Sequence, residues 1–114
     1  MKSVVVLMLS LAAVQSIEIG DAPIYEGRLS WADQGFEFRG CNKDEIYFVD
    51  ASFSIQDTLD RFLQSHSTVN ANSIYIRFHG NVVEGVDGLP DRYADVVRIT
   101  DLLSYNATSP ARCK

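Results

Sequence analysis

Apolar and polar side chains alternate through residues 73–80, and this stretch constrains the fold more than any other part of the chain. Successive side chains of a β-strand point to opposite faces, so the alternation predicts a strand with one buried face. The inward series is Ile74, Ile76 and Phe78, and the outward series is Tyr75, Arg77 and His79. Gly80 then interrupts the pattern, which predicts a bend or a bulge.

The rest of the chain gives this strand its place in a fold. Strand patterns precede it at 24–31, 36–41 and 45–50, a helical pattern covers 51–66, and a last strand pattern covers 92–103. Three strands, one helix and two strands are the order of the OB-fold. We therefore predict a mainly β, five-stranded OB-fold-like barrel with its helix between strands 3 and 4. An open α+β sheet with the helix on one face is the alternative.

The helical segment has a clear apolar stripe. Ile55, Leu59, Phe62 and Leu63 recur at helical spacing and predict the buried face of the helix. Ser54 is the residue that we expect to cap its N-terminus, because a serine side chain can accept a hydrogen bond from a free backbone N–H there.

The first residues have the pattern of an export signal. A short basic start is followed by an apolar run over 4–14 and by compact residues at 14–16. We predict a signal peptide over 1–16 and one domain over 17–114, located in the periplasm or outside the cell. A buried N-terminal strand or helix is the alternative.

Cys41 and Cys113 are the two cysteines of the chain. In an exported protein an even count favours a disulfide, and we predict a Cys41–Cys113 bond. It would close a loop of about 70 residues, worth roughly 4 kcal/mol in the chain-entropy treatment. Two unpaired thiols are the alternative.

The charge of the chain excludes some partners. The formal net charge is −5, and removal of Lys2 with the leader makes it −6. This balance argues against nucleic acid, which requires clustered basic residues, and against adhesion to anionic lipid. A second apolar run is absent from the sequence, so we expect no membrane insertion.

The layout resembles the C-terminal OB domain of the NlpE-like envelope lipoproteins, over about residues 24 to 113. The residues that carry the resemblance lie at 25–27, 36–41, 47–49, 74–76, 80, 93, 96–99 and 113. The full lipoproteins of that family are implicated in surface sensing, envelope stress signalling and copper homeostasis, and they carry a lipid-attachment cysteine and a CxxC pair. This sequence has no CxxC pair. The resemblance therefore implies the fold and the compartment.

Catalytic and metal-binding patterns are weak. The sequence has no Gly-x-Ser-x-Gly motif and no phosphate-binding glycine loop, and a disulfide would leave no free thiol for nucleophilic catalysis. His66 and His79 are its two histidines, whereas transition-metal sites usually take three or four ligands. We predict no enzymatic activity, no cofactor and no metal site.

Outward-facing aromatic and basic residues are the best candidates for a contact surface. They are Arg39, Tyr47, Tyr75, Arg77 and His79. OB-folds bind along the face of their second and third strands, between flanking loops. Ordinary packing of these side chains is the alternative. Asn106 begins an Asn-Ala-Thr glycosylation acceptor pattern, which matters only in a eukaryotic secretory pathway.

We therefore predict a monomeric, exported OB-fold binding module of the bacterial envelope whose partner is a protein or a glycan. An accessory protein of envelope stress or metal homeostasis, and a small enzyme inhibitor, are the alternatives.

Overall fold

A computed structural model describes residues 22–32, 35–66 and 73–113 of the chain. Its elements are β1 (Ile24–Ala32), β2 (Gly35–Gly40), β3 (Ile46–Asp50), α2 (Phe53–His66), β4 (Ser73–Val83) and β5 (Asp95–Asn106). The predicted signal peptide over 1–16 lies outside the described residues. Among those residues, none of the helices has the length and apolar character needed to cross a bilayer.

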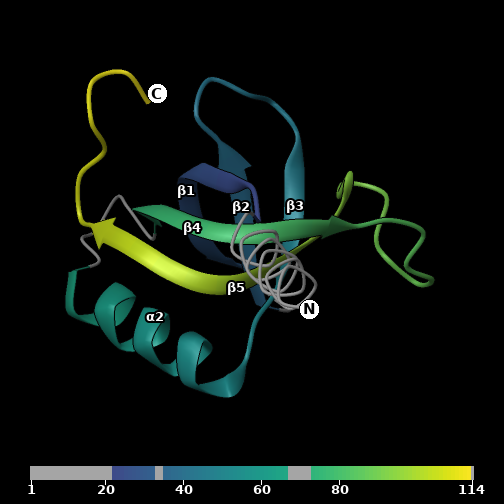
Figure 1. Cartoon of the computed structure of the whole chain (residues 1–114), viewed down its shortest axis with the longest axis horizontal. Coiled ribbons are helices and arrows are strands. Elements are labelled where there is room, and N and C mark those ends of the chain that lie inside the picture. Colours follow the sequence, from purple (N-terminus) through teal and green to yellow (C-terminus); the bar gives the residue numbers. More distant parts are fainter. Residues whose placement is uncertain (1–21, 33–34, 67–72, 114) are drawn as a thin grey trace, which may run out of the picture.

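The five strands form a closed barrel in the order β1-β2-β3-β5-β4, with β4 returning to pair with β1. Strands β3 and β5 run parallel, and the other neighbours run antiparallel. Figure 1 shows α2 alongside one end of the barrel, between β3 and β4 in the chain. The predicted OB-fold-like barrel is thus confirmed, and the open sheet is excluded.

Near Gly80 the ladder between β4 and β5 has two register shifts of the β-bulge kind, and their extra residues, Thr100 and Leu103, lie on β5. The register of β4 against β5 shifts between Arg77 and Phe78 and again between His79 and Gly80. A Cβ atom on Gly80 would lie 2.3 Å from the carbonyl oxygen of Arg98 on β5. Only glycine therefore permits this close approach of the two backbones, and the bulges increase the local twist of β5.

Strand β5 begins later than the sequence pattern predicts. The chain turns just before it, because the Tyr93 N–H donates to the Pro90 carbonyl at 3.1 Å. The strand then extends from Asp95 to Asn106, rather than over 92–103. The residues ahead of it, from Glu84 onward, form the loop between β4 and β5.

Helix α2 begins one residue after Ser52, and Ser52 is its N-cap. The Ile55 N–H donates to the Ser52 hydroxyl oxygen at 3.3 Å. The prediction that Ser54 caps the helix is wrong, because Ser54 already lies inside the first turn. Ser52 and Ser54 are both serines near the start of the helical pattern, and a serine at either position could accept a hydrogen bond from the N–H three residues later. The sequence alone therefore does not show which of them caps the helix.

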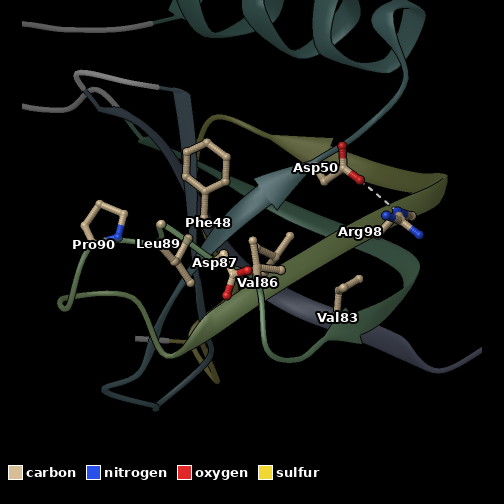
Figure 2. A pocket seen from close by; sticks show the side chains of 10 residues that line it. Phe48, Asp50, Val83, Val86, Asp87, Leu89, Pro90 and Arg98 are labelled. Carbon is tan, nitrogen blue, oxygen red and sulfur yellow. Dashed lines mark hydrogen bonds and ion pairs between the residues drawn. The ribbon is translucent and has the colours of Figure 1, made fainter.

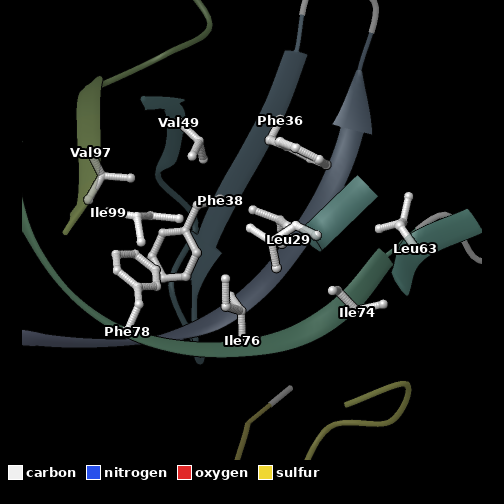
Figure 3. Close-up of a cluster of buried hydrophobic side chains, with 11 residues drawn as sticks. Leu29, Phe36, Phe38, Val49, Leu63, Ile74, Ile76, Phe78, Val97 and Ile99 are labelled. Atoms are coloured by element: carbon white, nitrogen blue, oxygen red, sulfur yellow. The ribbon is translucent and has the colours of Figure 1, made fainter. Parts of the chain in front are cut away.

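The core fills the barrel and extends to the helix. Leu59 and Leu63 of α2 are buried against it, while Ile55 and Phe62 are partly buried beside them. Figure 3 shows the buried side chains converging from the strands and the helix. The members drawn from the barrel are Leu29, Phe36, Phe38, Val49, Ile74, Ile76, Phe78, Val97 and Ile99. The inward series predicted for β4 is therefore confirmed.

A disulfide joins Cys41 to Cys113, with the sulfur atoms 2.01 Å apart. The two residues are 72 positions apart in sequence. The bond fixes the C-terminal segment after β5 to the end of β2, and the predicted Cys41–Cys113 disulfide is confirmed.

Candidate functional site

The residues predicted for the contact surface occupy different parts of the barrel. Arg39 on β2 is exposed on the outer face, where it lies opposite Arg28 of β1. Tyr47 on β3 lies opposite the buried Phe38, so it faces the interior side of the sheet. Tyr47 therefore does not share a surface with Arg39, contrary to the sequence prediction.

Tyr47 belongs to a separate hollow of about 340 Å³ that Tyr25 and Glu45 also line. Its hydroxyl donates to the Glu45 carboxylate at 3.4 Å. Burial and the neighbouring carboxylate of Glu45 raise the pKa of the Tyr47 phenol above its ordinary value.

Tyr75 faces outward on β4, but its side chain is only 5% exposed. Its hydroxyl donates to the carboxylate of Glu26 on β1, and Arg112 of the C-terminal segment forms an ion pair with the same carboxylate. Burial is the main cause that raises the pKa of Tyr75, and Glu26 adds to it. Tyr75 thus links two strands and the C-terminal segment, and it offers little surface to a partner.

Arg77 and His79 are half-buried on β4. Arg77 lies opposite Glu26 of β1 and Ser104 of β5. The Nδ1 atom of His79 lies 2.8 Å from the carbonyl oxygen of Ala22, which places this histidine against the chain that leads into β1. Over residues 22–32, 35–66 and 73–113, no three or more His, Cys, Asp or Glu side chains converge into a metal site.

One hollow on the outer face is a cleft that we call the loop cleft, with a volume of about 360 Å³. One wall is the sheet, and the other is the loop between β4 and β5. The apolar residues that line it are Phe48, Val83, Val86, Leu89, Pro90 and Val96. Its volume lies at the lower end of the range of ligand sites, about 300 to 1,000 Å³.

Polar groups lie at defined places in the loop cleft. The Arg98 Nε atom of β5 donates to the Asp50 carboxylate of β3 at 2.7 Å. Figure 2 shows this pair at one side of the cleft, with Phe48, Leu89 and Pro90 at the other. Asp87 of the loop also lines the cleft, and no ion pair involves it within the described part of the chain.

A three-residue cluster anchors the loop to the barrel. The carboxylate of Glu37 on β2 forms an ion pair with Arg92 and accepts a hydrogen bond from the Tyr93 hydroxyl at 2.6 Å. The Tyr93 ring packs edge-on against Phe48, with ring centroids 5.5 Å apart. These contacts hold the C-terminal end of the loop against β2 and β3, which keeps one wall of the cleft in place.

A second hollow, which we call the arginine cleft, lies on the same outer face. Its volume is about 320 Å³, and Arg28, Arg39, Glu37, Ile46 and Ser73 are among its lining residues. Glu37 lies directly opposite Phe48 across β2 and β3. The two clefts are therefore neighbours, separated by the cluster of Glu37, Arg92 and Tyr93.

Sequence reasoning found Arg39 but missed both clefts. The loop offered one signal, because Val86 and Leu89 are aliphatic residues within a loop rich in glycine and carboxylates. The hairpin offered another. If Ala32 pairs with Gly35, Arg28 lies opposite Arg39, and this pairing is the observed register.

Comparisons of the chain with protein-family models, with curated proteins and with solved structures found no match. The geometry of the outer face is therefore the basis for a function, and the resemblance to the NlpE-like OB domain stays a prediction.

Proposed function

We propose that this protein is an exported, non-enzymatic binding module of the bacterial envelope that contacts a protein partner through the loop cleft. The observation that carries the proposal is the cleft itself. Its floor includes β3, and its other wall is the loop between β4 and β5. OB-folds bind along the face of strands 2 and 3 and at the loop between strands 4 and 5, so the cleft overlaps this region in part.

The walls suit an apolar side chain of a partner. Val86 is 40% exposed although it is aliphatic, and it lines the cleft together with Phe48 and Val96. Burying such surface contributes about 25 cal/mol per Å² of apolar area. Polypeptides supply apolar side chains more readily than glycans do, and this favours a protein partner over a glycan.

The charge around the cleft suits a basic group next to that apolar side chain. Glu84, Asp87 and Asp91 of the loop are exposed and take part in no ion pair among the described residues. The two arginines nearby, Arg92 and Arg98, are already paired with Glu37 and Asp50. Charge complementarity of this kind raises association rates and selects partners.

Export is supported by the disulfide, since such bonds persist in oxidising compartments. The leader pattern over 1–16 is the second support. Neither observation identifies the partner, so the test begins from the native envelope.

The proposal is tested by capture followed by a quantitative comparison of variants. The full chain retains a protein from an envelope extract, and the affinity of the purified partner is then measured by calorimetry. We expect Val86→Asp to weaken binding about tenfold or more, because it places a second carboxylate on the apolar wall.

Leu103→Asp is the matched control. Leu103 is aliphatic and 38% exposed, close to the exposure of Val86, but it lies on β5 outside the loop cleft. Equal affinity of both variants for the partner contradicts the proposal, as does retention of a glycan alone.

A further inference from the structure

We propose that the arginine cleft is a subsite for the carboxylate of an acidic side chain on a polypeptide partner, held by Arg28 and Arg39. The inference rests on the proposed function in one respect, since it takes the partner to be the polypeptide that occupies the loop cleft. It adds a second, oppositely charged contact that neither the fold nor the loop cleft requires.

The first observation is that two arginines lie side by side on one face. Arg28 and Arg39 are directly opposite on the antiparallel pair β1 and β2, and both line the arginine cleft. Like charges directly opposite on a sheet destabilise it. In a chain with a net charge of −5, such a pair is an unexpected concentration of positive charge.

The second observation is that no carboxylate of the described residues forms an ion pair with Arg28. Its Nε atom donates to the Ser73 hydroxyl at 3.2 Å, a terminal nitrogen donates to the Ser73 carbonyl at 3.3 Å, and another donates to the Ser109 hydroxyl. All of these partners are neutral. Arg28 is half-buried, so its charge is partly withdrawn from water without a counter-charge, which is costly.

The third observation is that the nearby carboxylates are already used. Glu37 lines the arginine cleft but is paired with Arg92, and Glu26 is paired with Arg112. Arg39 is exposed and forms no hydrogen bond or ion pair among the described residues. Its five donors are therefore available to an incoming group.

The serine contacts of Arg28 also fix the direction of its guanidinium. Ser73 is the first residue of β4, and Ser109 lies in the segment that the disulfide fixes in place. An arginine held by its neighbours loses less side-chain entropy on binding than a free one. A carboxylate is the matching ligand, because its two oxygens can accept the parallel donors of the Arg39 guanidinium while Arg28 adds a second positive charge.

Adjacency favours a polypeptide over an acidic glycan. The wall between the clefts is the cluster of Glu37, Arg92 and Tyr93, and the Tyr93 ring packs on Phe48 of the loop cleft. A ligand that crosses this wall meets apolar groups and loop carboxylates on one side and arginines on the other. A polypeptide can present an apolar side chain, a basic side chain and an acidic side chain in such a row.

The test uses short blocked peptides that differ in one residue, Ala-Glu-Ala and Ala-Gln-Ala, titrated into the full chain. The readout is the NMR shift of the Arg28 and Arg39 Nε–H groups. We expect a saturable shift with the glutamate peptide and none with the glutamine peptide. Arg39→Gln should weaken the glutamate peptide about tenfold, the loss of one charge-assisted bidentate contact.

Arg61→Gln is the control, because it removes one charge from an exposed arginine on α2 and should leave the affinity unchanged. Equal affinity of wild type and Arg39→Gln overturns the inference, and so does a response to sodium chloride that matches the response to the glutamate peptide. A shift with glucuronate but not with the glutamate peptide overturns the polypeptide assignment and points to an acidic glycan.

The two proposals fail separately. Val86→Asp alters the loop cleft and should leave the arginine shifts with the glutamate peptide intact. Loss of partner binding in Val86→Asp with no arginine shift in any titration refutes the carboxylate subsite alone. Arginine shifts that saturate normally, with equal partner affinity in Val86→Asp and wild type, refute the loop cleft alone.

Discussion

The Tyr75 hydroxyl on β4 donates a hydrogen bond to the Glu26 carboxylate on β1, and Tyr75 itself is almost fully buried. Because Arg112 pairs with the same carboxylate, this one contact connects β1, β4 and the C-terminal segment. It also explains why an aromatic residue that the alternation places on the outside is withdrawn from solvent.

We expect Tyr75→Phe to lower the free energy of unfolding by about 1.5 to 3 kcal/mol, the usual contribution of a hydrogen bond to a charged group. The Glu26 carboxylate keeps its pairing with Arg112, which limits the loss. Urea unfolding provides the measurement. Tyr25→Phe is the control, since Tyr25 packs on Phe78 through its ring and no hydrogen bond of its hydroxyl occurs within the described residues. A control loss as large as that of Tyr75→Phe contradicts the prediction.

Because of the same Tyr75 phenol, the free energy of unfolding should fall as the pH rises in the alkaline range. The pKa of Tyr75 is raised above its ordinary value of 10.0, so the folded chain holds this proton more tightly than the unfolded chain. The resulting stability is complete below about pH 10 and is lost as the pH rises through the folded-state pKa. Urea unfolding at stepped pH should show a steeper alkaline loss for the wild type than for Tyr75→Phe. Parallel curves contradict the assignment.

Gly80→Ala should destabilise the fold by about 1 to 3 kcal/mol, because the new methyl group meets the Arg98 carbonyl across β4 and β5. Gly40→Ala is the matched control. The nearest atom to a Cβ there is Cγ of the Lys43 side chain at 3.4 Å, which can move aside. Thermal unfolding compares the two variants. A melting temperature of Gly80→Ala at or above that of Gly40→Ala rules out the close approach as the constraint.

Ser52→Ala should cost about 1 kcal/mol, whereas Ser54→Ala should cost less. Only the Ser52 hydroxyl accepts from a backbone N–H at the start of α2. Chemical denaturation monitored by circular dichroism distinguishes the pair. Equal losses would return Ser54 to the capping role that the sequence pattern gave it.

Replacing both cysteines by serine should lower stability by up to about 4 kcal/mol, the chain-entropy value for a closure of this length. The C-terminal segment should lose its place first, because few side-chain contacts then hold it: Arg28–Ser109, Glu26–Arg112 and the hydrogen bond from Asn42 to the Arg112 carbonyl. Hydrogen exchange over residues 107–113 measures this release. Unchanged protection there contradicts a fixing role for the bond.

The fold could be predicted from the sequence because its signals are local and agree with one another. In both β4 and α2, polar residues between the apolar ones show which side chains face the core. The order of the strands and the helix along the chain then indicates the OB-fold-like barrel. The segment over 46–49 has no such alternation, because Ile46, Tyr47, Phe48 and Val49 are all apolar or aromatic. Its facing was therefore undetermined, and Tyr47 was placed on the wrong side.

The candidate site was harder to predict because it depends on contacts between distant segments. The burial of Tyr75 depends on Glu26, which lies 49 positions away in sequence. The loop cleft exists because Arg92 and Tyr93 reach Glu37, 55 and 56 positions earlier. No local sequence pattern predicts these contacts, although the aliphatic residues of the loop indicate that it packs against another part of the chain.

The Cys41–Cys113 bond encloses the loop between β4 and β5 within the segment that it closes. A protease that cuts the backbone once in this loop therefore produces two fragments that remain a single covalent molecule. Strand β5, on the fragment after the cut, still pairs with β3 and β4 on the fragment before it. A nicked molecule would thus migrate as intact protein on a non-reducing gel and as two bands after reduction. In an environment rich in proteases, the loop between β4 and β5 can therefore be cleaved without releasing either half of the barrel.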